Sequence, residues 1–181
     1  MSVPISVLVY PTVNTPSSSS SGTGSASAVS DNTSGSMGIA GVYPPFNLFE
    51  AASSGLHWSG FQWPVLASGA AVQSIEPVVL YSGSFFDPDG AMGSLIVTDQ
   101  DGGEPGFPSL PSSGTWVGGS IGTSQSSLTA YALNFSLAAT LKLSNYSSSL
   151  FIQSISLRMT VLVPGTSIVE INVGNTKPLG S

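Results

Sequence analysis

The sequence contains no cysteine and very little charge. Without cysteine the chain forms no disulfide and offers no thiol nucleophile or zinc–thiolate site. Charged residues make up only 7% of its 181 residues, against about 25% in an average globular domain. The surface must therefore be covered mostly by Ser, Thr, Gly, Asn and Gln, which do little to keep copies of the chain apart. This composition favours a protein that is covered by partners in an assembly; the alternative is a soluble protein with a hydroxyl-rich coat.

Positive charge is the scarcest kind: the basic residues are Lys142, Arg158 and Lys177, and the formal net charge is -6. Nucleic-acid binding depends on neutralising phosphates with several Lys and Arg side chains, so we expect no nucleic-acid partner. Because positive charge is so scarce, we also expect no attraction to anionic membranes. No window approaches the roughly 20 apolar residues of a membrane span, and no basic residue precedes the short apolar stretch at the N-terminus. We therefore expect no membrane insertion and no signal peptide, and a location in a virion or an extracellular assembly.

Candidate catalytic residues are also few. Any Ser-His-acid triad would need His57, the one histidine, and no G-x-S-x-G motif surrounds a serine. Packing or a loop hydrogen bond is the plainer interpretation of His57. Paired carboxylates near aromatic residues would suit glycoside hydrolysis, but no pairing geometry can be read from the sequence. We therefore predict that the protein is not an enzyme.

The carboxylates are unevenly distributed, since five of the nine acidic residues fall between positions 87 and 104. Two Asp-x-Asp-Gly sequences, at 87–90 and 99–102, each place two carboxylates beside a sharp turn, which suits the oxygen ligands of calcium. Hairpin turns favour Asp and Gly on their own account, however, and the full EF-hand pattern is missing. Plain turns are therefore the favoured interpretation, and no cofactor is expected; calcium is the alternative. The candidate ligands are Asp87, Asp89, Asp99 and Asp101.

The N-terminal part of the chain divides into a strand and a polar segment. Residues 1–13 are typical of a short strand, bounded by Pro4 and Pro11, that belongs at the edge of a sheet. Residues 14–41 are of low complexity, rich in Ser, Gly and Ala, and are predicted to be a flexible linker that proteases cut. The strand either folds back onto its own domain or pairs with a neighbouring subunit as an assembly arm. The apolar residues of this arm are Val3, Ile5, Val7, Leu8 and Val9.

The segment 42–66 is the most aromatic part of the chain, and three prolines interrupt it. Neither the helix period nor the strand period is sustained, so we expect an irregular segment over a core, with one helical turn at 50–54. Aromatic side chains can stack on sugar rings where they are exposed, although most aromatic side chains belong to a core. The candidate stacking residues are Trp58, Trp63 and Trp116.

From residue 70 onward the pattern is that of β-strands. Strands are expected at 72–81, 93–98, 115–121, 129–137, 151–163 and 168–173. In the clearest of them Arg158 points away from an apolar face that consists of Phe151, Ile155, Leu157, Met159, Val161 and Val163. Antiparallel strands with tight turns and no helix between them predict an all-β fold: an antiparallel β-sandwich or jelly-roll-like single domain over 42–181.

Two functions are consistent with these observations. The first is a non-enzymatic structural protein that self-assembles into a particle or surface layer, as a virion component of capsid, decoration or tail type. This expectation is an analogy of composition and architecture, and its partners are further copies of the chain and other structural subunits. The second is a carbohydrate-binding β-sandwich module whose aromatic residues stack on sugar.

Overall fold

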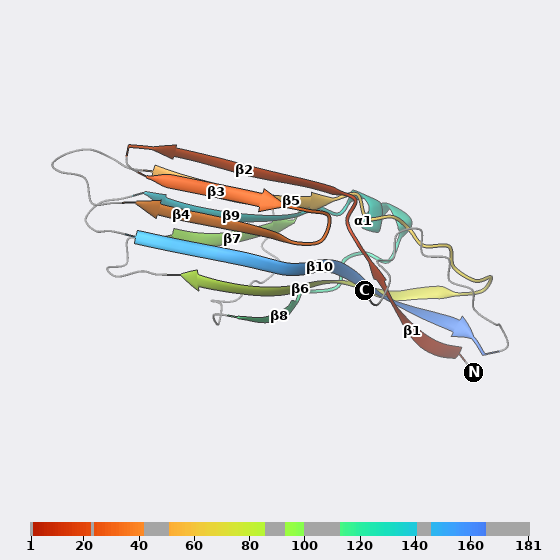
Figure 1. Ribbon diagram of the computed structural model, residues 1–181. Coiled ribbons are helices and arrows are strands. Elements are labelled where there is room, and N and C mark those ends of the chain that lie inside the picture. Colours follow the sequence, from red (N-terminus) through yellow and green to blue (C-terminus); the bar gives the residue numbers. More distant parts are fainter. Residues whose placement is uncertain are drawn as a thin grey trace, which may run out of the picture.

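Strands fill most of the chain in the computed structural model. The structure describes residues 2–22, 24–41, 51–85, 93–99, 113–140 and 146–165, and these ranges contain ten strands and one short helix. The paired strands are all antiparallel and form two sheets (Figure 1). The all-β fold that the sequence predicts is therefore confirmed.

The larger sheet, sheet A, is organised around one long strand. This strand, β10, pairs with β6 on one edge. On its other edge, residues 146–152 of β10 pair with β4 and residues 157–164 of β10 pair with β1. The order across the sheet is β3-β4-β10-β6-β8, with β1 beside the far half of β10. The strands of sheet A are β1 (Ser2–Val9), β3 (Ser25–Ser30), β4 (Gly35–Gly41), β6 (Ala71–Phe85), β8 (Ser113–Val117) and β10 (Tyr146–Pro164).

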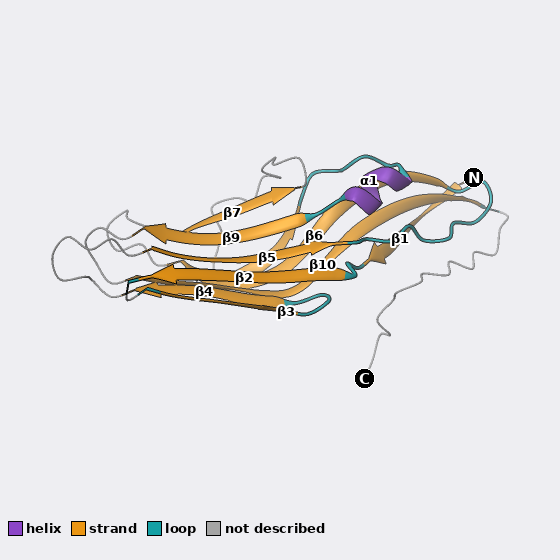
Figure 2. Cartoon of the chain, turned by 90° about the horizontal axis from the view of Figure 1, so that it is seen from above, coloured by secondary structure: helices purple, strands orange, loops and turns teal. Residues whose placement is uncertain are grey.

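The smaller sheet, sheet B, packs against the first half of β10 and its neighbours, and the two layers make a sandwich (Figure 2). Its order is β2-β5-β9-β7. The part of β6 and β10 that extends past sheet B lies beside the helix α1 instead. These elements are β2 (Val13–Ser21), β5 (Ala51–Ser59), β7 (Gly93–Asp99), α1 (Gln125–Ala130) and β9 (Leu133–Thr140).

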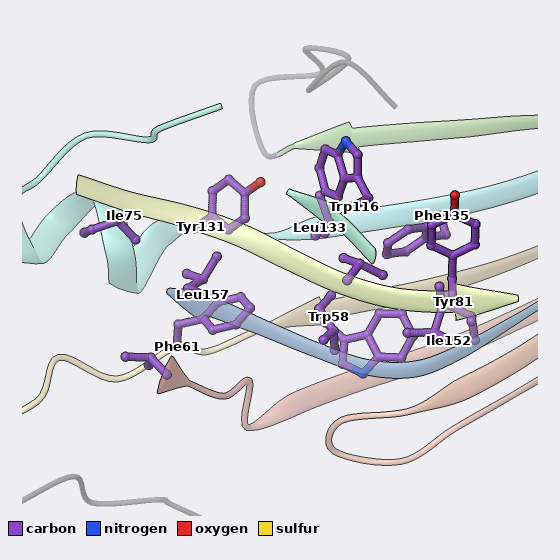
Figure 3. Packing of buried hydrophobic residues seen from close by; sticks show 14 of the residues in the cluster. Trp58, Phe61, Ile75, Tyr81, Trp116, Tyr131, Leu133, Phe135, Ile152 and Leu157 are labelled. Atoms are coloured by element: carbon purple, nitrogen blue, oxygen red, sulfur yellow. The ribbon is translucent and has the colours of Figure 1, made fainter. Parts of the chain in front are cut away.

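The core between the sheets is apolar and largely aromatic (Figure 3). Trp58 of β5 is fully buried and meets Phe135 of β9 edge-on, with ring centroids 5.8 Å apart. Its indole Nε1 donates a hydrogen bond of 3.1 Å to the carbonyl of Asp31, so the polar atom of the ring is satisfied. Three residues further along the chain, Phe61 packs against Tyr131, with ring centroids 6.1 Å apart.

The strand pattern of the C-terminal half is mostly confirmed. Leu157 and Val161 are fully buried, and Arg158 points to the opposite face. The strands expected at 72–81, 93–98 and 151–163 lie within β6, β7 and β10. The strand expected at 129–137 begins only at Leu133, because Ser124 accepts a hydrogen bond from the backbone of Ser127 and starts α1 there. The strand expected at 168–173 lies outside the described residues.

The prediction for Phe151 is wrong, because a β-bulge interrupts the alternation. Between Ile152 and Ser154 the pairing of β10 with β6 shifts by one residue, and Gln153 is the extra residue. A bulge changes which side chains share a face. Ile152 is therefore buried in the core with Ile155, whereas Phe151 points outward with 47% of its surface exposed.

The prediction of a flexible linker at 14–41 is also wrong, since these residues form β2, β3 and β4. Backbone pairing with β5 and β10 orders them without requiring large side chains. Met37 and Ile39 supply buried apolar surface, and small residues allow close packing. A Cβ at Gly35 would lie 3.1 Å from the ring of Trp58.

The segment 42–66 contains a strand where an irregular path and a helical turn at 50–54 are expected. β5 covers 51–59, and its residues alternate in burial as a strand requires. Ser54 conceals this period in the sequence, because it is polar and yet occupies a buried position. Residues 42–50 lie outside the described residues.

The N-terminal strand β1 folds back onto its own chain by pairing with β10. Val7 and Val9 are buried, Ile5 packs partly against the core, and Val3 and Leu8 are exposed. Only Tyr10, Pro11 and Thr12 separate β1 from β2, so the expected long tether does not exist. Exchange of β1 between subunits stays a prediction.

We expect Leu157→Ala to destabilise the fold by about 2–5 kcal/mol, because truncation of a fully buried leucine removes apolar contacts and leaves a cavity. Leu162→Ala, a matched change on the opposite face of the same strand, should cost less. Urea denaturation followed by circular dichroism measures both. An unfolding midpoint of Leu157→Ala equal to that of the wild type would contradict this assignment of faces.

Removal of residues 2–9 should lower the free energy of unfolding by several kcal/mol. The deletion exposes the edge of β10 at 157–164 and removes Val7 and Val9, each worth about 1.5–3 kcal/mol when buried. Val3→Ser, a change at an exposed site of the same strand, serves as the control. A truncated chain with an unchanged unfolding midpoint would show that β1 is an accessory arm.

Candidate interaction surface

The outer face of sheet A, the face turned away from sheet B, carries an unusual share of exposed apolar side chains. Eight large apolar side chains are exposed among the described residues, and five of them lie on this face. Their chain neighbours point into the core, so strand alternation forces them outward. They are Leu8 (42% exposed), Val29 (67%), Leu80 (37%), Val117 (43%) and Phe151 (47%).

Two charged side chains of this face neutralise each other. Arg158 and Glu76 are cross-strand partners on β10 and β6, and both Nε and Nη2 of the guanidinium donate to Oε2 of the carboxylate, at 3.1 and 2.7 Å. The side chains are 40% and 27% exposed, so the pair contributes at most about 1 kcal/mol to folding. Its effect on the surface is larger, because the described part of the face has no net charge.

A shallow hollow of about 330 Å³ lies beside Phe151 on the same face. Gly38 forms part of its floor, because a glycine on an outward position leaves the sheet bare. No lining residue is charged. The lining residues are Ser25, Ala26, Ser27, Gly38, Ile39, Ala40, Ser84, Ser147, Ser148 and Ser149.

The outer face of sheet B has a different character, because its described side chains are mainly hydroxyls and amides. Ser19 and Ser53 are hydrogen-bonded across β2 and β5 at 2.8 Å. His57 lies between Asn134 and Ser59: its Nδ1 is 2.5 Å from the amide oxygen, and its Nε2 is 3.2 Å from the hydroxyl. Both ring nitrogens are thus occupied by neutral groups. This is the hydrogen-bonded interpretation of His57, and no described carboxylate contacts the ring.

The tryptophans do not form a stacking platform. Trp58 is fully buried and Trp116 is 6% exposed, so neither can lie against a sugar in this conformation. Trp63 is half-buried and packs against the core. The alternation of β5 and β8 points Trp58 and Trp116 inward, and the sequence around Trp58 conceals that alternation. The structure therefore contradicts the stacking role of Trp58 and Trp116.

The candidate calcium ligands stay untested. Asp87, Asp89 and Asp101 lie outside the described residues, and Asp99 ends β7 at a position whose side chain is likewise not described. Within the described ranges no three His, Asp or Glu side chains are grouped as a metal site requires. Nor does the described part of the chain contain a helix long and apolar enough to cross a membrane.

The chain matches no family model, no curated protein and no solved structure. Its function must therefore be inferred from its own residues and their arrangement.

A variant that keeps Trp58 as its one tryptophan, Trp63→Phe with Trp116→Phe, should fluoresce at short wavelength and resist quenching by acrylamide, because the ring is buried. Soluble polysaccharides should leave this emission unchanged. The matching variant that keeps Trp63 should be quenched more strongly. A saccharide-dependent shift in the emission of Trp58 would restore the stacking hypothesis.

Proposed function

We propose that this protein is a non-enzymatic structural protein that self-assembles through the outer face of sheet A. The observation that carries the proposal is that five of the eight exposed large apolar side chains among the described residues lie on one face, whose described charges cancel. This uneven distribution of exposed apolar side chains favours the outer face of sheet A as an interaction site. The outer face of sheet B, with its hydroxyl and amide groups, is the face suited to remain in water.

The energetics of such an association are favourable for a chain of this composition. Burial of the exposed part of each apolar side chain contributes about 1 kcal/mol, so five on each partner offset a substantial part of the entropic cost of association. Arg158 and Glu76 form an ion pair, so no described charge of this face is desolvated without its partner. Low charge elsewhere weakens the repulsion that normally separates copies.

Two of the edge strands are poorly suited to self-association by strand pairing. β1 contains Pro4 and β2 contains Pro16, and proline cannot donate a main-chain hydrogen bond to an added strand. This protection of edges is a common device against uncontrolled pairing of sheets. Association through a face is therefore favoured over extension at these edges.

The assembly we propose is a particle or surface layer, most simply a virion component of capsid, decoration or tail type. A β-sandwich with few charges suits this role, and the step from fold to role is an analogy. A carbohydrate-binding module is the weaker candidate, because Trp58 and Trp116 are buried.

The proposal predicts that the wild-type chain is an oligomer or a particle, and that Leu80→Ser combined with Phe151→Ser reduces it to a monomer with an unchanged circular dichroism spectrum. Size-exclusion chromatography with light scattering measures the mass. Val65→Ser is the control, because Val65 is 67% exposed and lies outside sheet A. A wild-type chain that stays monomeric at high concentration, or a double variant that assembles normally, would overturn the proposal.

A further inference from the structure

Phe151 and the hollow are neighbours on the outer face of sheet A. Phe151 and Ser149 are two residues apart on β10, so both side chains point outward. The hollow includes the cross-strand row Ser27, Gly38, Ser149 and Ser84, and the next row is Val29, Ser36, Phe151 and Ser82. A projecting aromatic ring therefore stands directly beside a recess.

The recess has the size and chemistry to accept such a ring. Its volume is about 330 Å³, and it is open to solvent on the outer face of sheet A. The walls are serine side chains, and the floor consists of backbone and small residues. The edge of an aromatic ring is positively polarised, so hydroxyl oxygens on the walls interact favourably with an inserted ring. With no charged lining residue, the recess offers nothing to select an ionic ligand.

We propose that Phe151 of one copy inserts into the hollow of a second copy, an inference that rests on the proposed self-assembly. Phe151 and the hollow adjoin on one face. A twofold axis that lies in the plane of this face, perpendicular to the strands and between Phe151 and the hollow, places two copies face to face. It also puts the Phe151 of each copy opposite the hollow of the other. Each Phe151 then meets the hollow of the other copy, as an isologous interface requires. Val29, in the same row as Phe151, adds apolar surface to the contact.

Charge does not oppose this pairing. A twofold interface places identical surfaces opposite each other, so a net charge on the face would be repelled by its own copy. The described charges of this face, on Arg158 and Glu76, compensate each other within one chain. The hollow itself contributes none. The charge on this surface therefore permits a second copy of the chain as the occupant.

Gly38→Val tests the hollow without touching Phe151. A Cβ at Gly38 would lie 3.5 Å from the Ser27 hydroxyl and 3.7 Å from the Ser148 carbonyl, which are ordinary contacts. Valine is also a better strand residue than glycine, so the variant should fold as well as the wild type while its side chain fills the hollow. The matched control is Gly119→Val, because a Cβ at Gly119 meets nothing within 4 Å.

We expect Gly38→Val and Phe151→Ser each to weaken self-association at least tenfold by light scattering, and Gly119→Val to leave it unchanged. An equimolar mixture of the two defective variants should regain heterodimers. In such a heterodimer, the intact Phe151 of the Gly38→Val chain meets the intact hollow of the Phe151→Ser chain. Native mass spectrometry resolves these heterodimers if one variant is isotopically labelled.

The outcomes separate this inference from the proposed function. If Leu80→Ser with Phe151→Ser dissociates the protein while Gly38→Val assembles normally, the face is the interface but the hollow is not the seat of Phe151. If Gly38→Val and Phe151→Ser each dissociate but their mixture forms no heterodimer, the two features do not contact each other, and the inference is overturned. A monomeric wild type overturns both.

Discussion

The alternation of side chains along β10 is the constraint on which the rest of the structure depends. Every second residue of this strand enters the core, and β4, β1 and β6 all take their register from it. The bulge at Gln153 corrects the phase of that alternation part-way along. It allows Ile152 and Ile155 to be buried together, and the same step turns Phe151 to the outside. The core and the candidate interaction surface are therefore two consequences of one strand.

Small residues let a chain with little charge and a serine-rich N-terminal region still form a sandwich. β2 and β3 bury no complete large side chain, yet each is held by a ladder of main-chain hydrogen bonds to a better-packed neighbour. Side chains tie these outer strands together as well: Asn14 of β2 bonds to Asn32 and accepts from Ser30. Gly35 makes room for the ring of Trp58. Main-chain pairing and close approach thus replace apolar burial at this edge of the molecule.

The two outer faces divide the surface of the protein into parts of different chemistry. The described outward side chains of sheet B are mainly those of serine, threonine and asparagine, together with the exposed Val13 and with His57 held between two neutral groups. Sheet A presents apolar side chains, a neutralised ion pair and a recess lined by hydroxyls. Such an asymmetry is expected of a subunit that turns one face to its copies and the other to water. The low charge of the sequence would favour such an association, since few charges must be desolvated when two faces meet.

The sequence by itself determined the all-β class, the strands within β6, β7 and β10, and the burial of Leu157 and Val161, because a regular two-residue period is a local property. It could not reveal β2 to β4, whose order comes from pairing with strands distant in the chain. Nor could it place Trp58 in the core, since the polar but buried Ser54 hides the period of β5. The candidate surface was decided only by tertiary structure. A bulge exists only relative to the partner strand, and the hollow beside Phe151 joins residues from β3, β4, β6 and β10.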